Sequence, residues 1–527
     1  GRDATWLAIG ASIFASNIGS EHLIGLAGAG ASSGMAMAHW EIQGWMILIL
    51  GWVFVPFYTR SMVYTMPEFL ERRYNPQSRT ILSVISLVSY VLTKVAVTVY
   101  AGGLVFQQVF GIKELWGIDF FWIAAIGLVV LTALYTIFGG MKSVLYTSVL
   151  QTPILLLGSL IILVLGFKEL GGWDEMMRVC GAVTVNDYGD TMTNLIRSND
   201  DANFPWLGAL IGSAIIGFWY WCTDQFIVQR VLSGKNEMEA RRGTIFGAYL
   251  KLLPVFLFLI PGMIAFALHQ KYIGAGGEGF LPMLANGTAN ADAAFPTLVA
   301  KLLPAGVKGL VVCGILAALM SSLASLFNSS AMLFTIDFYK RFRPETPEKK
   351  LVGIGQVATV VIVILGILWI PIMRSVGDVL YTYLQDVQSV LAPGIAAAFL
   401  LGICWKRTSA QGGMWGLIAG MVIGLTRLGA KVYYSNAGEV ADSTFKYLFY
   451  DMNWLFFCGW MFLFCIIVVI VVSLATKAPT AEKIQGLVFG TATKEQKAAT
   501  RASWNHWDII HTVIILAITG AFYWYFW

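Results

Sequence analysis

Long apolar segments recur along the whole chain and are separated by short polar connections. A helix that crosses a bilayer needs about 20 mostly apolar residues. Thirteen segments meet this requirement: 6–30, 44–66, 80–110, 121–140, 147–167, 206–229, 244–268, 305–335, 352–372, 380–402, 412–430, 454–475 and 506–526. The pattern therefore predicts an all-α polytopic membrane protein.

Polar residues interrupt two of these predicted helices. The first, 6–30, contains the run SNIGSEH at 16–22, and the sixth, 206–229, contains TDQ at 223–225. Interrupted helices at equivalent positions of two five-helix halves are typical of inverted-repeat transporters, whose binding site lies beside the breaks. Gly and Ser can also serve close helix packing alone, but Asn, Glu and His together in the first break favour a site.

The order of the helices divides the chain into four parts. We expect a first repeat at 1–167, an extracellular loop at 168–205, a second repeat at 206–407 and three peripheral helices at 408–527. If residue 1 is cytoplasmic, Lys and Arg favour the cytoplasmic connections by about two to one, as the positive-inside rule requires. Because the chain begins without Met and enters its first helix almost at once, we also expect that an N-terminal segment has been lost.

Composition agrees with a membrane protein. Hydrophobic residues make up 57% of the chain and charged residues only 12%, which leaves too little polar surface for a soluble protein of this size. The net charge of +5 is small and there is no polybasic tail, so nucleic acid is not an expected partner. We expect a multi-pass protein of the plasma membrane, the inner membrane if the source is bacterial, with the lipid bilayer as its surroundings and no obligate protein partner implied.

Few ionisable residues lie within the predicted membrane helices, where such residues are usually functional. They are Glu21, His22, Glu41, Lys94, Asp224, Lys251 and Asp386. Four further polar or aromatic residues lie near them: Asn17, Tyr220, Trp221 and Gln385. Sugar hydroxyls both donate and accept hydrogen bonds, so this mixture of carboxylate, amide, ammonium and imidazole groups is typical of a sugar site.

Other interpretations of these residues stay open at this point. Tyr220 and Trp221 can be packing residues, and Glu41 and Lys251 can form an internal ion pair that holds the bundle closed. Lys94, a single polar residue in an apolar helix, can be structural or lie near the inner mouth.

The eighth predicted helix carries adjacent hydroxyls at Ser321 and Ser322. Sodium is a hard cation that prefers oxygen ligands, and an interrupted first helix would leave the carbonyls of Ala15 and Ile18 unpaired. Serine pairs in membrane helices also commonly bond back to the carbonyl four residues earlier, so the pair alone is weak evidence for a cation site.

Several long motifs resemble the sodium/glucose cotransporter family of the sodium/solute symporters. They are ASNIGSEHLIGLAGAGASSG, FGGMKSVLYTSVLQT, GFWYWCTDQFIVQRVLSGKN, GAYLKLLPVFLFLIPGMIAFAL, GILAALMSSLASLFNSSAMLFTIDFYK and LYTYLQDVQSVLAPGIAAAFLLGICWKR. The resemblance covers essentially the whole chain and is closest to the bacterial galactose and animal glucose members. It implies a five-plus-five inverted-repeat core with flanking helices, and sodium-coupled uptake of a hexose such as galactose or glucose.

The resemblance also implies roles for individual residues. Sugar contacts fall on Asn17, His22, Glu41, Tyr220, Trp221, Lys251 and Gln385. Tyr220 is also the inner gate, and the outer gate falls on Leu26, Trp40 and Tyr381. Sodium falls to the carbonyls of Ala15, Ile18 and Ala318 and the hydroxyls of Ser321 and Ser322.

Some family members bind a second sodium ion, using an Asp on the fifth helix and a Thr-Ser pair beyond the eighth-helix serines. Here Ser148 stands in place of the Asp, and Ala324-Ser325 replaces the Thr-Ser pair. Without that carboxylate a second cation site lacks a compensating charge, so we predict one sodium ion per sugar.

Alternative functions remain to be compared. Within the same class, the solute could be myo-inositol, proline, sialic acid or another carboxylate, although Glu41 in the pocket disfavours an anion. A channel, a transporter-like sensor or a membrane enzyme is disfavoured, because we find no ring of like charges, appended signalling domain, nucleophile motif or metal-ligand cluster in the sequence.

Overall fold

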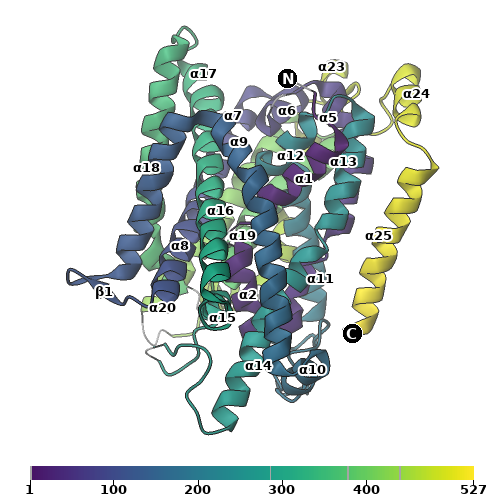
Figure 1. Ribbon diagram of the computed structural model, residues 1–527. Coiled ribbons are helices and arrows are strands. Elements are labelled where there is room, and N and C mark those ends of the chain that lie inside the picture. Colours follow the sequence, from purple (N-terminus) through teal and green to yellow (C-terminus); the bar gives the residue numbers. More distant parts are fainter. Residues whose placement is uncertain (1–2, 20, 64, 285, 377–378, 438–440) are drawn as a thin grey trace.

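The computed structural model describes residues 3–19, 21–63, 65–284, 286–376, 379–437 and 441–527, with side chains except at 135–152, 328 and 374–376. Eleven segments of this part of the chain are long and apolar enough to cross a membrane, and two shorter apolar helices, Trp6–Asn17 and Phe120–Leu134, accompany them. The predicted all-α polytopic architecture is confirmed (Figure 1).

The α-helices run in chain order as follows: α1 (Trp6–Asn17), α2 (Ala27–Ser33), α3 (Ala38–Glu41), α4 (Gly44–Ile49), α5 (Val55–Ser61), α6 (Met66–Arg73), α7 (Pro76–Ser89), α8 (Ala96–Phe110), α9 (Phe120–Leu170), α10 (Trp173–Gly181), α11 (Trp206–Gly217), α12 (Gln225–Leu232), α13 (Glu237–Leu250), α14 (Ile260–Gly274), α15 (Ala294–Leu302), α16 (Ala305–Met332), α17 (Lys340–Phe342), α18 (Glu348–Val376), α19 (Leu380–Cys404), α20 (Ala410–Asn436), α21 (Thr444–Lys446), α22 (Trp454–Ala475), α23 (Ala481–Ile484), α24 (Lys494–Ala502) and α25 (His506–Tyr525). The π-helical turns are η1 (Glu21–Leu26), η3 (Leu50–Phe54), η4 (Tyr90–Val95), η5 (Phe218–Thr223), η6 (Val255–Leu259), η8 (Leu333–Tyr339) and η9 (Tyr447–Asp451), and the 3-10 turns are η2 (Gly34–Met37) and η7 (Ala291–Ala293). Two short strands, β1 (Glu114–Leu115) and β2 (Ile118–Asp119), form an antiparallel hairpin.

Both predicted interruptions are confirmed. Helix α1 ends at Asn17, Ile18 is extended (φ −77°, ψ 101°), and helical structure resumes with η1. In the second interrupted helix, η5 ends at Thr223 and Asp224 is extended (φ −73°, ψ 128°) before α12 begins. The Asp224 carboxylate accepts a hydrogen bond from the N–H of Phe226, so this residue caps the helix that follows the break.

Helix α9 joins two of the predicted spans, 121–140 and 147–167, into one helical element of 51 residues. At 1.5 Å per residue a straight helix of this length would be about 77 Å long, more than twice the hydrocarbon thickness of a bilayer. The β1–β2 hairpin that precedes α9 and the α10 helix that follows it lie at the same end of the bundle (Figure 1). The element therefore runs across and back, as two spans would.

Glycines bring α2 into backbone contact with the segment formed by η6 and α14. A Cβ atom added to Gly30 of α2 would overlap the carbonyl oxygen of Leu259, and one added to Gly262 of α14 would overlap that of Ala27. Small residues allow this close approach in membrane bundles. The contact fixes α2, which continues from the first break, against the segment that follows Lys251.

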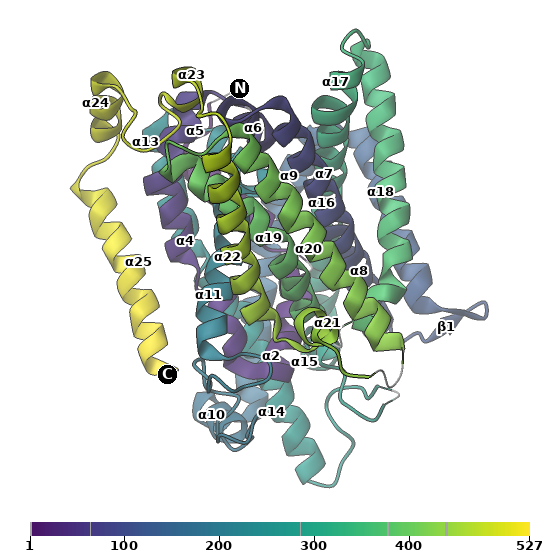
Figure 2. The ribbon, with the colours of Figure 1, turned by 180° about the vertical axis from the view of Figure 1, so that it is seen from behind.

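The connections between helices separate to two ends of the bundle. The N-terminus, α6, α17, α23 and α24 lie at one end, and α10, the β1–β2 hairpin, α21 and the C-terminus lie at the other (Figures 1 and 2). This is the alternation predicted from the sequence. Figure 2 shows α20 and α22 on the outside of the bundle over α19.

Candidate functional site

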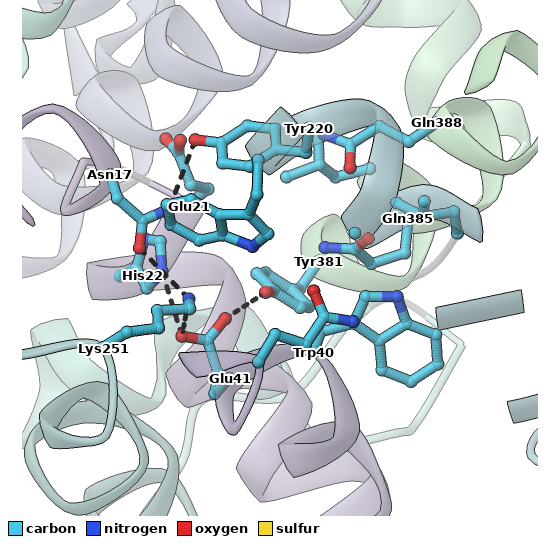
Figure 3. Close-up of a pocket in the computed structure, with 15 residues that line it drawn as sticks. Asn17, Glu21, His22, Trp40, Glu41, Tyr220, Lys251, Tyr381, Gln385 and Gln388 are labelled. Carbon is cyan, nitrogen blue, oxygen red and sulfur yellow. Dashed lines mark hydrogen bonds and ion pairs between the residues drawn. The ribbon is translucent and has the colours of Figure 1, made fainter. Parts of the chain in front are cut away.

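A polar cavity lies beside both helix interruptions (Figure 3). The space in it that is open to water is about 40 Å³, far below the ~300–1,000 Å³ that is usual for small-molecule sites. All seven predicted sugar contacts line it: Asn17, His22, Glu41, Tyr220, Trp221, Lys251 and Gln385. Two predicted outer-gate residues, Trp40 and Tyr381, also line it, whereas Leu26 is fully buried at the end of η1 and does not belong to the lining.

Glu41 is the centre of the hydrogen-bond network in this cavity. The Lys251 ammonium donates to Glu41 Oε2 at 2.5 Å, and His22 Nε2 lies 3.3 Å from the same oxygen. The Tyr381 hydroxyl donates to the other carboxylate oxygen, Oε1. The side chain of Glu41 is fully buried, and a buried carboxylate requires such partners. The ion pair that the sequence left as an alternative is thus present, and it forms part of the cavity wall.

Four separate elements position this network. Glu41 is the last residue of α3, and His22 lies in η1 just after the first break. Lys251 follows the last residue of α13, where the chain turns before it reaches η6. Tyr381 lies in the first turn of α19. Residues far apart in sequence therefore converge because the ends of these elements meet at the cavity.

Two aromatic residues of η5 form one wall of the cavity. The rings of Tyr220 and Trp221 are 4.9 Å apart at an interplanar angle of 83°. The Tyr220 hydroxyl accepts a hydrogen bond from Asn17 Nδ2 at 3.2 Å, and Lys251 donates to the Asn17 Oδ1 at 3.1 Å. Asn17 thus links the aromatic wall to the charged network across the first break.

Several buried polar atoms that face this site have no hydrogen-bond partner among the described residues. They are Gln385 Oε1, Trp40 Nε1 and His22 Nδ1. Buried polar atoms in native proteins are nearly always paired, so atoms of this kind in a cavity wall are suited to a polar ligand. The set contains an acceptor, a donor and a nitrogen that can act as either.

The first break also exposes backbone oxygens where sodium was predicted. In the described part of the chain no backbone N–H donates to the carbonyl oxygen of Ala15 or Ile18. A Cβ atom placed on Gly19 would lie 3.2 Å from the Ser322 hydroxyl oxygen, so α16 packs directly against the break. Ala318 lies one turn before Ser322 on α16.

A second buried ion pair lies at the second break. Lys94 of η4 donates to Asp224 Oδ2 at 3.1 Å, and its ammonium lies 3.8 Å from the centre of the Phe226 ring. Nearby, Arg230 Nε donates to the Ser16 hydroxyl at 3.0 Å. These contacts join the second break to α1 and η4 and make Lys94 one half of a buried ion pair.

The cavity wall also contains polar residues to which the sequence assigned no role. Glu21, Gln43 and Gln388 line it. Gln388 lies three residues after Gln385, so helical periodicity of α19 could have indicated it; Glu21 belonged to the list of ionisable residues. Asp386, from the same list, instead pairs with Lys431 of α20. The Ser148 side chain, on which the single-sodium prediction depends, lies outside the described residues.

Comparisons with known proteins show what the chain as a whole is similar to. Human sodium/myo-inositol cotransporter 2 is 36% identical over 504 residues, 93% of this chain and 74% of that protein. Sheep sodium/glucose cotransporter 1 is 39% identical over 495 residues, 90% of this chain and 74% of that protein. The fold matches a Na+-coupled sialic acid symporter solved in a substrate-bound, outward-open state, with a TM-score of 0.67, 22% identity and coverage of 90% of this chain and 91% of that one.

This structural match shows that the chain has the five-plus-five fold of such transporters with flanking helices. The relatives are sodium cotransporters, so the chain is a transporter rather than an enzyme and sodium is its coupling ion. The model of the sodium:solute symporter family matches residues 1–420. The chain therefore belongs to the sodium:solute symporter family.

Proposed function

We propose that this symporter couples sodium entry to uptake of a hexose such as galactose or glucose, by alternating access to the cavity described above. The observation that carries the proposal is a set of buried atoms around the fully buried Glu41 that have no hydrogen-bond partner among the described residues: Gln385 Oε1, Trp40 Nε1 and His22 Nδ1. A ring of hydroxyls, each both donor and acceptor, satisfies such a mixed set. The similarity to sheep sodium/glucose cotransporter 1 supports a sugar as the solute.

In this proposal each side of the cavity has a distinct role. Glu41, His22, Lys251, Asn17 and Gln385 bind the solute hydroxyls, and the flat face of Tyr220 or Trp221 covers an apolar face of the ring. Trp40 and Tyr381, with Leu26, close the outer side, and Tyr220 closes the inner side. The four parts of the chain, 1–167, 168–205, 206–407 and 408–527, stay our proposed boundaries for the two repeats, the outer loop and the peripheral helices.

Sodium, as the second substrate, is proposed to bind at the first break. Its ligands would be the carbonyls of Ala15, Ile18 and Ala318 and the hydroxyls of Ser321 and Ser322. The lack of a backbone donor to the carbonyls of Ala15 and Ile18 among the described residues supports this choice. An ion held between α1 and α16 would stabilise the contact between them, which gives sodium a means of favouring one conformation. Location in a bacterial inner membrane belongs to the same proposal.

A second candidate solute is myo-inositol. The human and dog sodium/myo-inositol cotransporters are 36–37% identical to this chain over 93% of its length, and inositol presents a ring of hydroxyls like a hexose. Two carboxylates, Glu21 and Glu41, line the cavity, so an anionic solute such as sialic acid is disfavoured.

Uptake into proteoliposomes tests the proposal. Labelled galactose, glucose and myo-inositol are presented with an inward sodium gradient, and potassium replaces sodium in the control. We expect sodium-dependent accumulation of a hexose, and preferential uptake of myo-inositol would establish the second candidate.

Glu41→Ala or Gln385→Ala should raise the solute concentration at half-maximal uptake by about 10- to 100-fold. Each substitution leaves buried partners unpaired, which costs roughly 1–3 kcal/mol. Unchanged half-saturation in Glu41→Ala would refute the assignment of the cavity.

A further inference from the structure

A groove separates α18 from the α7–η4 segment on the outside of the bundle. It holds about 750 Å³ of open space, against about 40 Å³ in the polar cavity beside the helix breaks. Leu87 and Val91 line it on one side, Val357 and Val361 on the other, and Phe334 of η8 also lines it. Both walls belong to helices long and apolar enough to cross a membrane, and α18 lies at one edge of the bundle (Figures 1 and 2). The groove therefore faces the acyl chains of the bilayer.

One end of this groove is positively charged. Lys350, an exposed residue in the first turn of α18, is the one ionisable residue among the described residues that line the groove. It belongs to the segment 340–350, which has five Lys and Arg residues and two Glu. This segment lies at the end of the bundle that the charge bias predicts to be cytoplasmic. A lysine at the end of a membrane helix extends along apolar surface and places its ammonium among the lipid head groups.

A second groove on α18 shows that the positive charge is particular to the first. It holds about 620 Å³ and is lined by Lys340, but also by Glu348 and the polar side chains of Gln356 and Thr359. A carboxylate in the same lining offsets the charge of the lysine. Only the groove that contains Lys350 combines apolar walls with an uncompensated cation in its described lining, which is the pattern that favours a negatively charged lipid.

We propose that the groove between α18 and α7–η4 binds a phospholipid with a negatively charged head group. One acyl chain lies between Val91 and Val357, and the head group lies at Lys350. The lipid also contacts η4, because Leu92 lines the groove, and the Leu92 carbonyl accepts a hydrogen bond from the hydroxyl of Tyr383 on α19 at 3.0 Å. Lipid binding is therefore connected to a helix of the solute cavity but does not depend on which solute the protein carries.

Native mass spectrometry of the purified, delipidated protein tests the site. Phosphatidylglycerol and phosphatidylcholine with identical acyl chains are added separately, and the fraction of protein with bound lipid is measured. We expect preferential binding of phosphatidylglycerol. Lys350→Gln should weaken that binding by about fivefold and leave phosphatidylcholine binding within about twofold. Gly353→Phe should weaken binding of both lipids, because Gly353 lines the groove and a Cβ atom added to it has no protein atom within 4 Å, so the new ring occupies the groove.

Lys497→Gln and Gly520→Phe are the matched controls. Lys497 is an exposed lysine of α24, and Gly520 of α25 also has no protein atom within 4 Å of an added Cβ. Both variants should bind phosphatidylglycerol within about twofold of the unaltered protein. Glycerol phosphate, the free head group, should not displace the lipid, and displacement would overturn the lipid assignment in favour of a site for free phosphate esters.

Equal binding of the two lipids to the unaltered protein would also overturn the proposal. So would phosphatidylglycerol binding that is unchanged in Lys350→Gln. This substitution alters only an exposed side chain, so its result decides the proposal even if Gly353→Phe does not fold.

Discussion

Tyr220 combines an aromatic face with a hydroxyl, and the structure separates what each should contribute. Tyr220→Phe keeps the ring and loses the hydrogen bond from Asn17, a change of about 1 kcal/mol or roughly fivefold in affinity. Tyr220→Ala removes the wall itself and should abolish tight binding. Solute half-saturation at saturating sodium distinguishes the two. Equal damage from Phe and Ala would show that the hydroxyl, not the ring, is what the solute needs.

For individual residues, the sequence predicted the charged side chains that line the cavity better than the amide side chains. Glu41 and Lys251 stand out because ionisable groups are rare in apolar helices. Gln43 and Gln388 do not, since an amide in a membrane helix is equally suited to helix packing. Gln43 does both: it lines the cavity and donates to the Ser213 carbonyl at 2.8 Å. Which way such a side chain faces depends on the rotation of its helix, which only packing against its neighbours decides.

The contact between α2 and α14 is the clearest example of an element placed by its glycines. Gly262→Ala would force the carbonyl of Ala27 away and should destabilise the protein by on the order of 1–3 kcal/mol. Gly520→Ala, on α25 with nothing within 4 Å of the new Cβ, should be neutral or slightly stabilising because Ala favours helix over Gly. Thermal unfolding of both variants in detergent checks this. A midpoint in Gly262→Ala equal to that of Gly520→Ala would contradict the close contact.

The connection between α14 and α15 carries a buried acid, Asp292 of η7. Its carboxylate accepts a hydrogen bond from the N–H of Leu380 at the start of α19. Burial raises the pKa of Asp292 from 3.8 to about 7, although the hydrogen bond from Leu380 opposes the shift. The folded state therefore binds this proton more tightly than the unfolded chain. This proton stabilises the folded state fully at pH values below the pKa of Asp292 in the unfolded chain, and the stabilisation is lost as the pH rises through about 7.

Thermal unfolding midpoints at pH 5 and pH 8 test this. The unaltered protein should lose on the order of 2–3 kcal/mol over that interval relative to Asp292→Asn, which keeps an acceptor for Leu380 but does not titrate. A parallel decline in both proteins would place the titrating group elsewhere.

Among the elements, the sequence predicted the two interruptions but not their geometry. Polar residues at 16–22 and 223–225 mark where the helices break. The π turns η1 and η5 beside the breaks leave no such pattern, because one extra residue per turn changes the face of a helix without changing its apolar composition. Helical periodicity could not predict the pairing of Lys94 with Asp224 either, because the two residues are 130 positions apart in the sequence.

At the scale of the whole molecule, hydropathy and charge sufficed for the topology, because connections must alternate between two aqueous faces. The number of coupled ions follows from chemistry instead. A second site would need a carboxylate where the sequence has Ser148, so we predict one sodium ion per solute molecule. One ion at 100 mV contributes about 2.3 kcal/mol and a tenfold sodium gradient about 1.4 kcal/mol. Together they allow roughly 500-fold accumulation of a neutral solute.

The reversal potential of sodium-coupled uptake in proteoliposomes tests the central claim most directly. Solute and sodium gradients are fixed and the membrane potential is varied until net solute flux is zero. The account predicts a reversal potential set by one sodium ion per neutral hexose or inositol molecule, and loss of that coupling in the Ser321→Ala, Ser322→Ala double variant. A ratio of two, solute flux that ignores sodium, or full coupling in the double variant would contradict it.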